Sequence, residues 1–284
     1  MIAFPTGISY AFAALFGLIW GSFLNVCIAR LPLHQSVVAP RSRCPDCRSL
    51  IRWYDNIPVL SYLLLRGRCR KCQKRISPFY PLVEILTACL FVVALAEFGP
   101  TRDFLKVIIF GMLMIVLIFT DLRERVIPHS VTLCGGVLGL ILSLAVPVND
   151  AVFGWVFRQM GFTLPVRLSS LVGAVTGGLF GAGLLYGVAW CFRRFGNPDK
   201  EYLGFGDVTL MFVVGTFLGI PLTYLAILLG SLAGTLVAVP FRLVSGRFQN
   251  YQWPYGSFLG AAAIYALMGG PALIAAYLRW SGFR

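Results

Sequence analysis

Apolar stretches close to 20 residues in length recur along the whole chain, and this feature limits the fold more than any other. A helix of about 20 apolar residues spans the hydrocarbon core of a bilayer. Of the 284 residues, 58% are apolar and only 12% are charged, far from the balance of a soluble domain. The sequence therefore predicts an all-α polytopic membrane protein.

Eight transmembrane helices are expected, at residues 7–29, 79–98, 105–120, 131–148, 169–192, 208–220, 223–241 and 256–277. The sixth is short, and Pro221 after it predicts a tight turn before the seventh; one long kinked helix is the alternative. The chain then divides into a first transmembrane helix (1–29), a polar loop (30–78) and a transmembrane core (79–284). Residues 149–168 are expected at the membrane interface.

Positive charge predicts the orientation. The first helix has no basic segment before it and no small-residue cleavage site, so we expect a retained anchor with its N-terminus outside. With residues 30–78 in the cytoplasm and alternating spans, the inner loops hold 18 Lys and Arg and the outer loops 6. Both termini then lie outside. This orientation and anionic lipid account for the net charge of +13, so no nucleic acid partner is predicted.

The polar loop contains two C-x-x-C pairs separated by 21 residues, formed by Cys44, Cys47, Cys69 and Cys72. Four thiolates in this pattern can hold one zinc ion tetrahedrally. A thioredoxin-like redox site is a weaker alternative because no βαβ pattern surrounds either pair, and structural disulfides are disfavoured in a reducing cytoplasm. We expect structural zinc, because a loop of this size with few apolar side chains cannot build its own core.

The other four cysteines lie singly in or beside the predicted spans, at Cys27, Cys89, Cys134 and Cys191. We interpret all four as small residues that serve packing.

Two acids stand at the predicted cytoplasmic edge of the membrane. Asp121 ends the third span and Asp207, in "LGFGDVTL", begins the sixth. Two carboxylates at one depth in a partly dry site share a proton, so that one can act as a base toward water and the other can polarise a carbonyl. Gly204 and Gly206 would permit a close backbone approach and unusual dihedral angles. Taken alone, this motif fits a helix-capping role for Asp207 equally well.

Over nearly its full length the chain resembles the type IV prepilin peptidase family, bifunctional leader peptidases and N-methyltransferases of pilus assembly and type II secretion. The resemblance rests on "GSFLNVCIARLP", "PRSRCPDC", "NIPVLSYLLLRGRCRKC" and "ISPFYPLVEILTACLF" in the N-terminal part, and on "DLRERVIP" and "GFGD" farther on. It implies a G-x-G-D membrane aspartic protease of the bacterial inner membrane, with Asp121 and Asp207 as the catalytic pair. Thr209 departs from the family's usual Lys, and His129 from its usual Asn or Asp, which leaves the level of activity open.

The resemblance also implies the substrate, a prepilin or pseudopilin with a short basic leader and a Gly before the scissile bond. Proteolysis by two aspartates needs no acyl-enzyme. The implied second reaction transfers a methyl group from S-adenosylmethionine to the new N-terminus, although no G-x-G-x-x-G nucleotide fingerprint occurs. Glu84 and Asn25 are the polar residues that we consider for this reaction, and a helix-to-helix hydrogen bond is an equal alternative for Asn25.

Two other functions compete. An ion- or proton-coupled transporter could use an intramembrane Asp pair, but it predicts inverted repeats, and the two halves of the chain show no convincing match. A non-catalytic assembly scaffold built on the zinc loop would tolerate Asn at both Asp positions.

Overall fold

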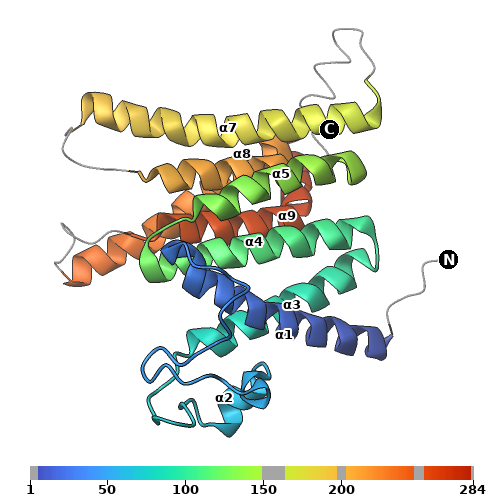
Figure 1. Cartoon of the computed structure of the whole chain (residues 1–284). Helices are drawn as coiled ribbons and strands as arrows, with labels where there is room; N and C mark the ends of the chain where they lie inside the picture. The colour runs from blue at the N-terminus through green and yellow to red at the C-terminus, as the bar shows by residue number, and fades with distance from the viewer. Residues whose placement is uncertain (1–5, 149–163, 197–202, 246–252, 283–284) are drawn as a thin grey trace. The chain divides into compact units, whose positions relative to one another are not determined.

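The computed structural model describes residues 6–148, 164–196, 203–245 and 253–282. Within these residues the regular structure is helical, with two isolated β-bridges in the polar loop, so the all-α prediction is confirmed (Figure 1). The chain divides into two compact units, Met1–Val116 and Leu117–Arg284. Most of the predicted interfacial segment, residues 149–163 of 149–168, lies outside the described residues.

Six described helices are long and apolar enough to cross a membrane: α1 (Gly7–Arg30), α3 (Phe79–Phe98), α4 (Arg102–Glu124), α7 (Val166–Phe195), α8 (Phe205–Ser245) and α9 (Tyr255–Trp280). A seventh apolar helix, α5 (His129–Ala145), has 17 residues, at the short end of the range for a span. The eight predicted spans thus correspond to these seven helices, with α8 covering the sixth and seventh spans.

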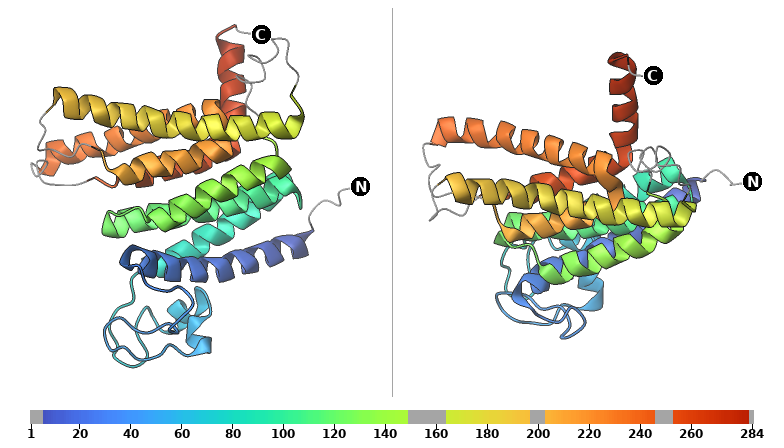
Figure 2. Two further views of the ribbon diagram at one scale, coloured as in Figure 1. Left: turned by 45° about the horizontal axis from the view of Figure 1, so that its top comes forward. Right: turned by 90° about the horizontal axis from the view of Figure 1, so that it is seen from above.

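Helix α8 turns back on itself at Gly219. The φ and ψ of Gly219, 71° and −180°, belong to a region that is essentially restricted to glycine. A Cβ on Gly181 of α7 would lie 2.5 Å from the Met211 carbonyl oxygen and 3.0 Å from Thr223 Cγ2. Met211 and Thr223 would be about 18 Å apart along a straight helix. The chain therefore reverses, and Figure 2 shows two separate helical halves.

The predicted position of this turn was off by two residues. It lies at Gly219, and Pro221 falls in the first turn of the second half of α8. A proline is tolerated there because the N–H groups of a first helical turn have no partner within the helix. The alternative of one long helix with a simple kink is wrong, because the two halves run in opposite directions.

In the N-terminal unit, α1 and α3 cross closely over two glycines. A Cβ on Gly17 would lie 2.6 Å from Ala88 Cα, and one on Gly21 would lie 2.6 Å from Glu84 Cα. Small residues four positions apart let two apolar helices approach to backbone contact. The loop between α1 and α3 carries two 3-10 turns, η1 (Leu31–Leu33) and η2 (Trp53–Asn56), and the short helix α2 (Leu60–Leu64).

In the C-terminal unit, the first half of α8 lies between α5 and α7. A Cβ on Gly177 of α7 would lie 2.5 Å from the Gly215 carbonyl oxygen, and one on Gly136 of α5 would lie 2.9 Å from the Phe212 ring. Leu210 and Val213 of this half are fully buried. A helix that is apolar on all sides is held by its neighbours, so the start of α8, with Asp207, has a fixed position.

Candidate active site

Asp121 lies in the last turn of α4. The helix stops because Arg125 adopts a positive φ of 58°, and its N–H donates to the Asp121 carbonyl oxygen at 3.0 Å. The Asp121 side chain is buried, and its Oδ2 accepts two hydrogen bonds from Ser257 at the start of α9. The Ser257 N–H donates at 2.7 Å and the Ser257 hydroxyl lies at 2.8 Å.

Asp207 lies in the first turn of α8, where its N–H donates to the Gly204 carbonyl oxygen at 3.1 Å. Gly206 does permit the expected close approach, because a Cβ there would lie 2.8 Å from Ile127 Cβ. The expectation of unusual dihedral angles is wrong, since neither glycine of this motif has a positive φ. At Gly204 a Cβ would meet only ordinary contacts, the nearest being Asp207 Oδ2 at 3.8 Å.

Gly256 of α9 lies close to both carboxylates. A Cβ on Gly256 would lie 3.0 Å from Asp207 Oδ1 and 3.2 Å from Asp121 Oδ2. The two oxygen atoms are therefore no more than about 6 Å apart, and both border a position left open by the missing side chain. The structure thus brings together the two aspartates that the sequence placed at one depth, 86 positions apart in the chain.

Hydrogen bonding distinguishes the two carboxylates. A hydrogen bond to a charged group contributes about 1.5–3 kcal/mol, and Asp121 accepts two. Its position at the C-terminal end of α4 opposes a negative charge by only about 0.3–1 kcal/mol. Burial opposes a charge on both aspartates, so of the two carboxylates the hydrogen bonds favour Asp121 as the one that carries the negative charge. A pair with one ionised and one protonated carboxyl can take a proton from water and give one to a carbonyl oxygen.

The two departures from the family pattern lie close to this site in the structure. The Thr209 hydroxyl donates to the Gly206 carbonyl oxygen at 2.9 Å, within its own helix, and brings no charge. The His129 ring packs against Phe205, with ring centroids 5.9 Å apart. His129 therefore borders the first turn of α8, which carries Asp207.

The four predicted zinc ligands come together in the N-terminal unit. Their sulfur atoms all lie within 4.8 Å of one another, with 3.8 Å between Cys44 and Cys72 and 4.0 Å between Cys47 and Cys69. Zinc–sulfur bonds of about 2.3 Å in a tetrahedron place two sulfurs about 3.8 Å apart. The cluster could therefore hold a zinc ion. It does not fit the disulfide alternative, because all four thiols are free.

Each cysteine pair is shaped by the same backbone turn. The Cys44 N–H donates to the Ser49 carbonyl oxygen, and the Arg48 N–H donates to the Cys44 carbonyl oxygen. In the second pair, the Cys69 N–H donates to the Lys74 carbonyl oxygen and the Gln73 N–H to the Cys69 carbonyl oxygen, both at 2.9 Å. The Ser49 hydroxyl, 3.0 Å from Cys47 Sγ, and the Ser49 backbone lower the pKa of that thiol to about 6. A lowered pKa favours the thiolate, which is the form that binds a metal.

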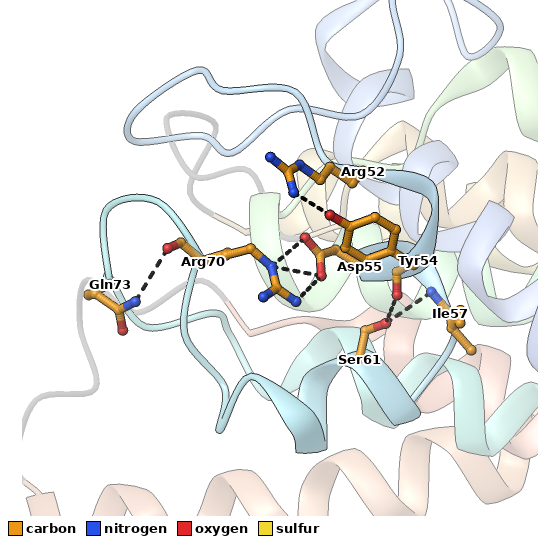
Figure 3. Close-up of polar contacts among 7 residues, drawn as sticks. All are labelled: Arg52, Tyr54, Asp55, Ile57, Ser61, Arg70 and Gln73. Atoms are coloured by element: carbon orange, nitrogen blue, oxygen red, sulfur yellow. Dashed lines mark hydrogen bonds and ion pairs between the residues drawn. The ribbon is translucent and has the colours of Figure 1, made fainter.

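Polar contacts also tie the segment between the two pairs to the second pair (Figure 3). The Arg70 guanidinium donates to both oxygens of Asp55, at 2.9 and 2.6 Å, and holds the pKa of that carboxyl below its usual range. The Tyr54 ring lies near the guanidinium groups of Arg70 and Arg52, with 5.6 and 5.7 Å from each carbon to the ring centroid. The Ser61 hydroxyl donates to the Tyr54 carbonyl oxygen at 2.8 Å.

Glu84 and Asn25, considered for methyl transfer, both make hydrogen bonds to the protein. Glu84 Oε2 accepts from the Val59 N–H at 2.7 Å, and Asn25 Nδ2 donates to the Tyr80 carbonyl oxygen at 3.0 Å. Val59 has a positive φ of 60°, uncommon for a β-branched residue. Glu84 therefore holds a strained loop residue against α3, and Asn25 links α1 to α3, as its structural alternative predicted. Neither contact tests a role in methyl transfer.

Comparison with known proteins matches both parts of the chain. Residues 15–98 match the Bacterial Peptidase A24 N-terminal domain, and residues 108–239 match the Type IV leader peptidase family. A prepilin leader peptidase/N-methyltransferase of Aeromonas salmonicida (strain A449) is 32% identical over 297 residues, 95% of this chain and 94% of that protein. The chain belongs to the type IV leader peptidase family.

Other prepilin leader peptidase/N-methyltransferases that resemble this chain come from other bacteria. The Bacillus subtilis (strain 168) protein is 31% identical over 93% of this chain and 96% of its own length. The Myxococcus xanthus (strain DK1622) protein is 40% identical over 83% of this chain, and the match spans 64% of that relative. No solved structure matches significantly. With its apolar helices, this family member is a multi-pass bacterial membrane protein, and the transporter alternative finds no support.

The residue ranges that match the family models contain some of the residues of the two sites, but not all of them. Asp121 and Asp207 lie within the matched residues 108–239, and the four cysteines lie within 15–98. Gly256 and Ser257 lie beyond both matched segments, and reasoning from the sequence missed them. The available signal was "WPYGSFLG", in which Pro and a small polar pair precede an apolar run, as at a helix start.

Proposed function

We propose that this chain is a membrane aspartic endopeptidase that removes the basic leader of type IV prepilins and pseudopilins after Gly. The observation that carries the proposal is the pair of buried carboxylates, Asp121 and Asp207, which both border the open position at Gly256. Membership of the type IV leader peptidase family supports the choice of substrate. The catalytic roles of the two aspartates are part of this proposal.

Hydrolysis follows from such a pair without a covalent intermediate. One carboxylate accepts a proton from water as the water oxygen bonds to the peptide carbonyl carbon, and the other carboxyl polarises the carbonyl oxygen. The scissile peptide must be extended, and a Gly before it lowers the cost of leaving the helical conformation. None of the eight cysteines is needed as a nucleophile.

The proposed orientation places the polar loop and the active site in the cytoplasm of the bacterial cell, at the inner membrane. It is supported by the excess of Lys and Arg in the loops assigned to that side. A prepilin inserted with its leader in the cytoplasm would present its scissile bond at the same membrane edge. The lipid bilayer is the other proposed partner, and no nucleic acid is involved.

The chain is proposed to consist of three parts: the first helix (1–29), the polar loop (30–78) and the protease core (79–284). Structural zinc is proposed for the polar loop. The donor set of Cys44, Cys47, Cys69 and Cys72 fits the ion, which would stabilise a loop with few buried side chains.

Methylation of the new N-terminus completes the proposed function, and the names of the relatives support it. S-adenosylmethionine would supply the methyl group. Glu84 Oε2 and the Asn25 amide group already make hydrogen bonds to protein backbone, so these contacts restrict how either residue could serve a cofactor. We keep both residues as candidates and assign no step to them.

Leader release from a purified prepilin by the protein in nanodiscs tests the proteolytic part. We expect Asp121→Asn and Asp207→Asn each to abolish release while the fold and the zinc content stay intact, because an amide cannot accept a proton from water. Release at the wild-type rate by either folded variant would exclude the paired-acid mechanism and favour a scaffold or another site.

A further inference from the structure

We propose that Ser257 is a positioning residue that determines which aspartate holds the shared proton, so that Asp121 is the ionised base and Asp207 the proton donor. The inference rests on the proposed proteolytic function and deepens it. Sequence motifs alone treat the two aspartates as equivalent. The structure does not, because the Asp121 carboxylate accepts two hydrogen bonds from Ser257 of α9, whereas the Asp207 carboxylate accepts one, from the Gly204 backbone.

The geometry at Ser257 fixes the direction of its hydrogen bonds. Its backbone N–H can only donate, and it lies 2.7 Å from Asp121 Oδ2. Its hydroxyl lies 2.8 Å from the same oxygen and 3.0 Å from the Ile118 carbonyl oxygen. The hydroxyl has one proton, and a charged carboxylate is a stronger acceptor than a carbonyl inside a helix. Both Ser257 groups therefore donate to Asp121 and favour its ionised form.

Charged and titratable groups of α8, of α9 and of the residues after α4 interact electrostatically with this pair. Asp207 comes from α8, Arg125 follows α4, and Tyr255 precedes Ser257 in α9. Arg125 carries a permanent positive charge and favours an ionised Asp121, in the same direction as Ser257. Once Asp121 is ionised, its negative charge favours the protonated form of Asp207, because two like charges at this distance repel each other.

The assignment gives a balanced reaction. Asp121 takes a proton from water as the water oxygen bonds to the carbonyl carbon, and Asp207 gives its proton to the carbonyl oxygen, which produces a gem-diol. When the carbon–nitrogen bond breaks, Asp121 gives its proton to the leaving amine, and one hydroxyl of the diol returns a proton to Asp207. Both aspartates then regain their starting states.

The test compares Ser257→Ala, which removes the hydroxyl, with Ser257→Thr, which keeps it. Ser143→Ala is the matched control, because it removes a buried hydroxyl of α5 that, among the described residues, donates within its own helix, to the Leu140 carbonyl oxygen at 2.7 Å. The pH dependence of leader release is measured for all three and for the wild type. We expect Ser257→Ala to move the acidic limb upward by about one pH unit and Ser257→Thr to restore it.

Other results would overturn the assignment. A uniform loss of rate in Ser257→Ala at every pH, with both limbs in place, would mean a structural role. A downward move of the basic limb with an unchanged acidic limb would mean that Asp121 holds the proton and donates it to Ser257.

Infrared titration of the protonated-carboxyl band separates this inference from the proposed function, because it follows the proton without turnover. We expect the first ionisation of the pair to move to higher pH in Ser257→Ala and to be restored in Ser257→Thr. If the wild type releases no leader, the peptidase proposal fails, and the infrared result still decides where the proton lies. An unchanged titration in Ser257→Ala would reject the role of Ser257 whether or not the protein is a peptidase.

Discussion

Gly256→Ala should stop proteolysis while leaving the fold in place. The new methyl group would lie 3.0 Å from Asp207 Oδ1, 3.2 Å from Asp121 Oδ2 and 2.8 Å from Ile127 Cδ1. Ordinary contacts of such a carbon are about 3.4–4 Å, so it would fill the space beside both carboxylates and displace them by a few tenths of an ångström. This is the space in which the proposed water must be held.

The magnitude follows from these distances. General acid–base catalysis contributes about 10²–10⁴-fold, and a misplacement near 1 Å costs about 10²-fold. We therefore expect kcat for leader release to fall at least about 100-fold. The isoleucine side chain can turn away from the methyl group, so the loss of stability should stay within about 1–3 kcal/mol, the usual cost of one added methyl.

The assay is single-turnover leader release in nanodiscs, with thermal unfolding measured in parallel. Gly183→Ala in α7 is the matched control, because nothing lies within 4 Å of its Cβ position. The control should keep full activity and gain up to about 1 kcal/mol of stability, since alanine favours a helix. Folded Gly256→Ala protein that releases leader within about threefold of the wild-type rate would refute the placement of the reacting water in the space at Gly256 beside the two carboxylates.

Removing zinc with a chelator, or by replacing both Cys44 and Cys72 with Ser, should lower the unfolding temperature and both activities; active, reduced protein without zinc would contradict this. Gly219→Ala should cost about 1–3 kcal/mol, because alanine is strained at a φ of 71°, whereas Gly187→Ala in α7 has open space and serves as the control for thermal unfolding. Asp121→Asn should still transfer labelled methyl from S-adenosylmethionine to a supplied mature pilin, because orientation of a neutral amine dominates that step. Loss of this transfer in folded, zinc-containing protein would mean that the two reactions share a site.

Sequence reasoning succeeded where a residue type has few uses in its surroundings. A carboxylate at a membrane span is costly, so Asp121 and Asp207 stood out, and the structure places them around one point. Paired cysteines in a polar loop have few other roles, and their four sulfur atoms do converge. In both cases the chemical properties of the side chains identified the residues in the sequence, and the structure places those residues close together.

Residues without distinctive chemistry were missed or misplaced. Pro221 is a conspicuous helix breaker, but the chain reverses at Gly219, where only glycine tolerates the backbone angles. The sequence contains 30 glycines, and nothing in it distinguishes Gly219 as the residue at which the chain reverses. Gly256 and Ser257 are common at helix starts, and they matter here because α9 begins beside the ends of two helices that are distant in the chain.

The arrangement at the aspartate pair explains why the site needs a third helix. Asp121 ends α4 and Asp207 begins α8, so two helices suffice to place two carboxylates near each other. Two equivalent carboxylates would give no preference for the location of the shared proton. The first turn of α9 supplies both missing parts, because Gly256 leaves room beside both acids and the Ser257 N–H and hydroxyl donate to Asp121. An acid and a base can thus be distinguished by hydrogen bonds from a helix start that carries no charged side chain.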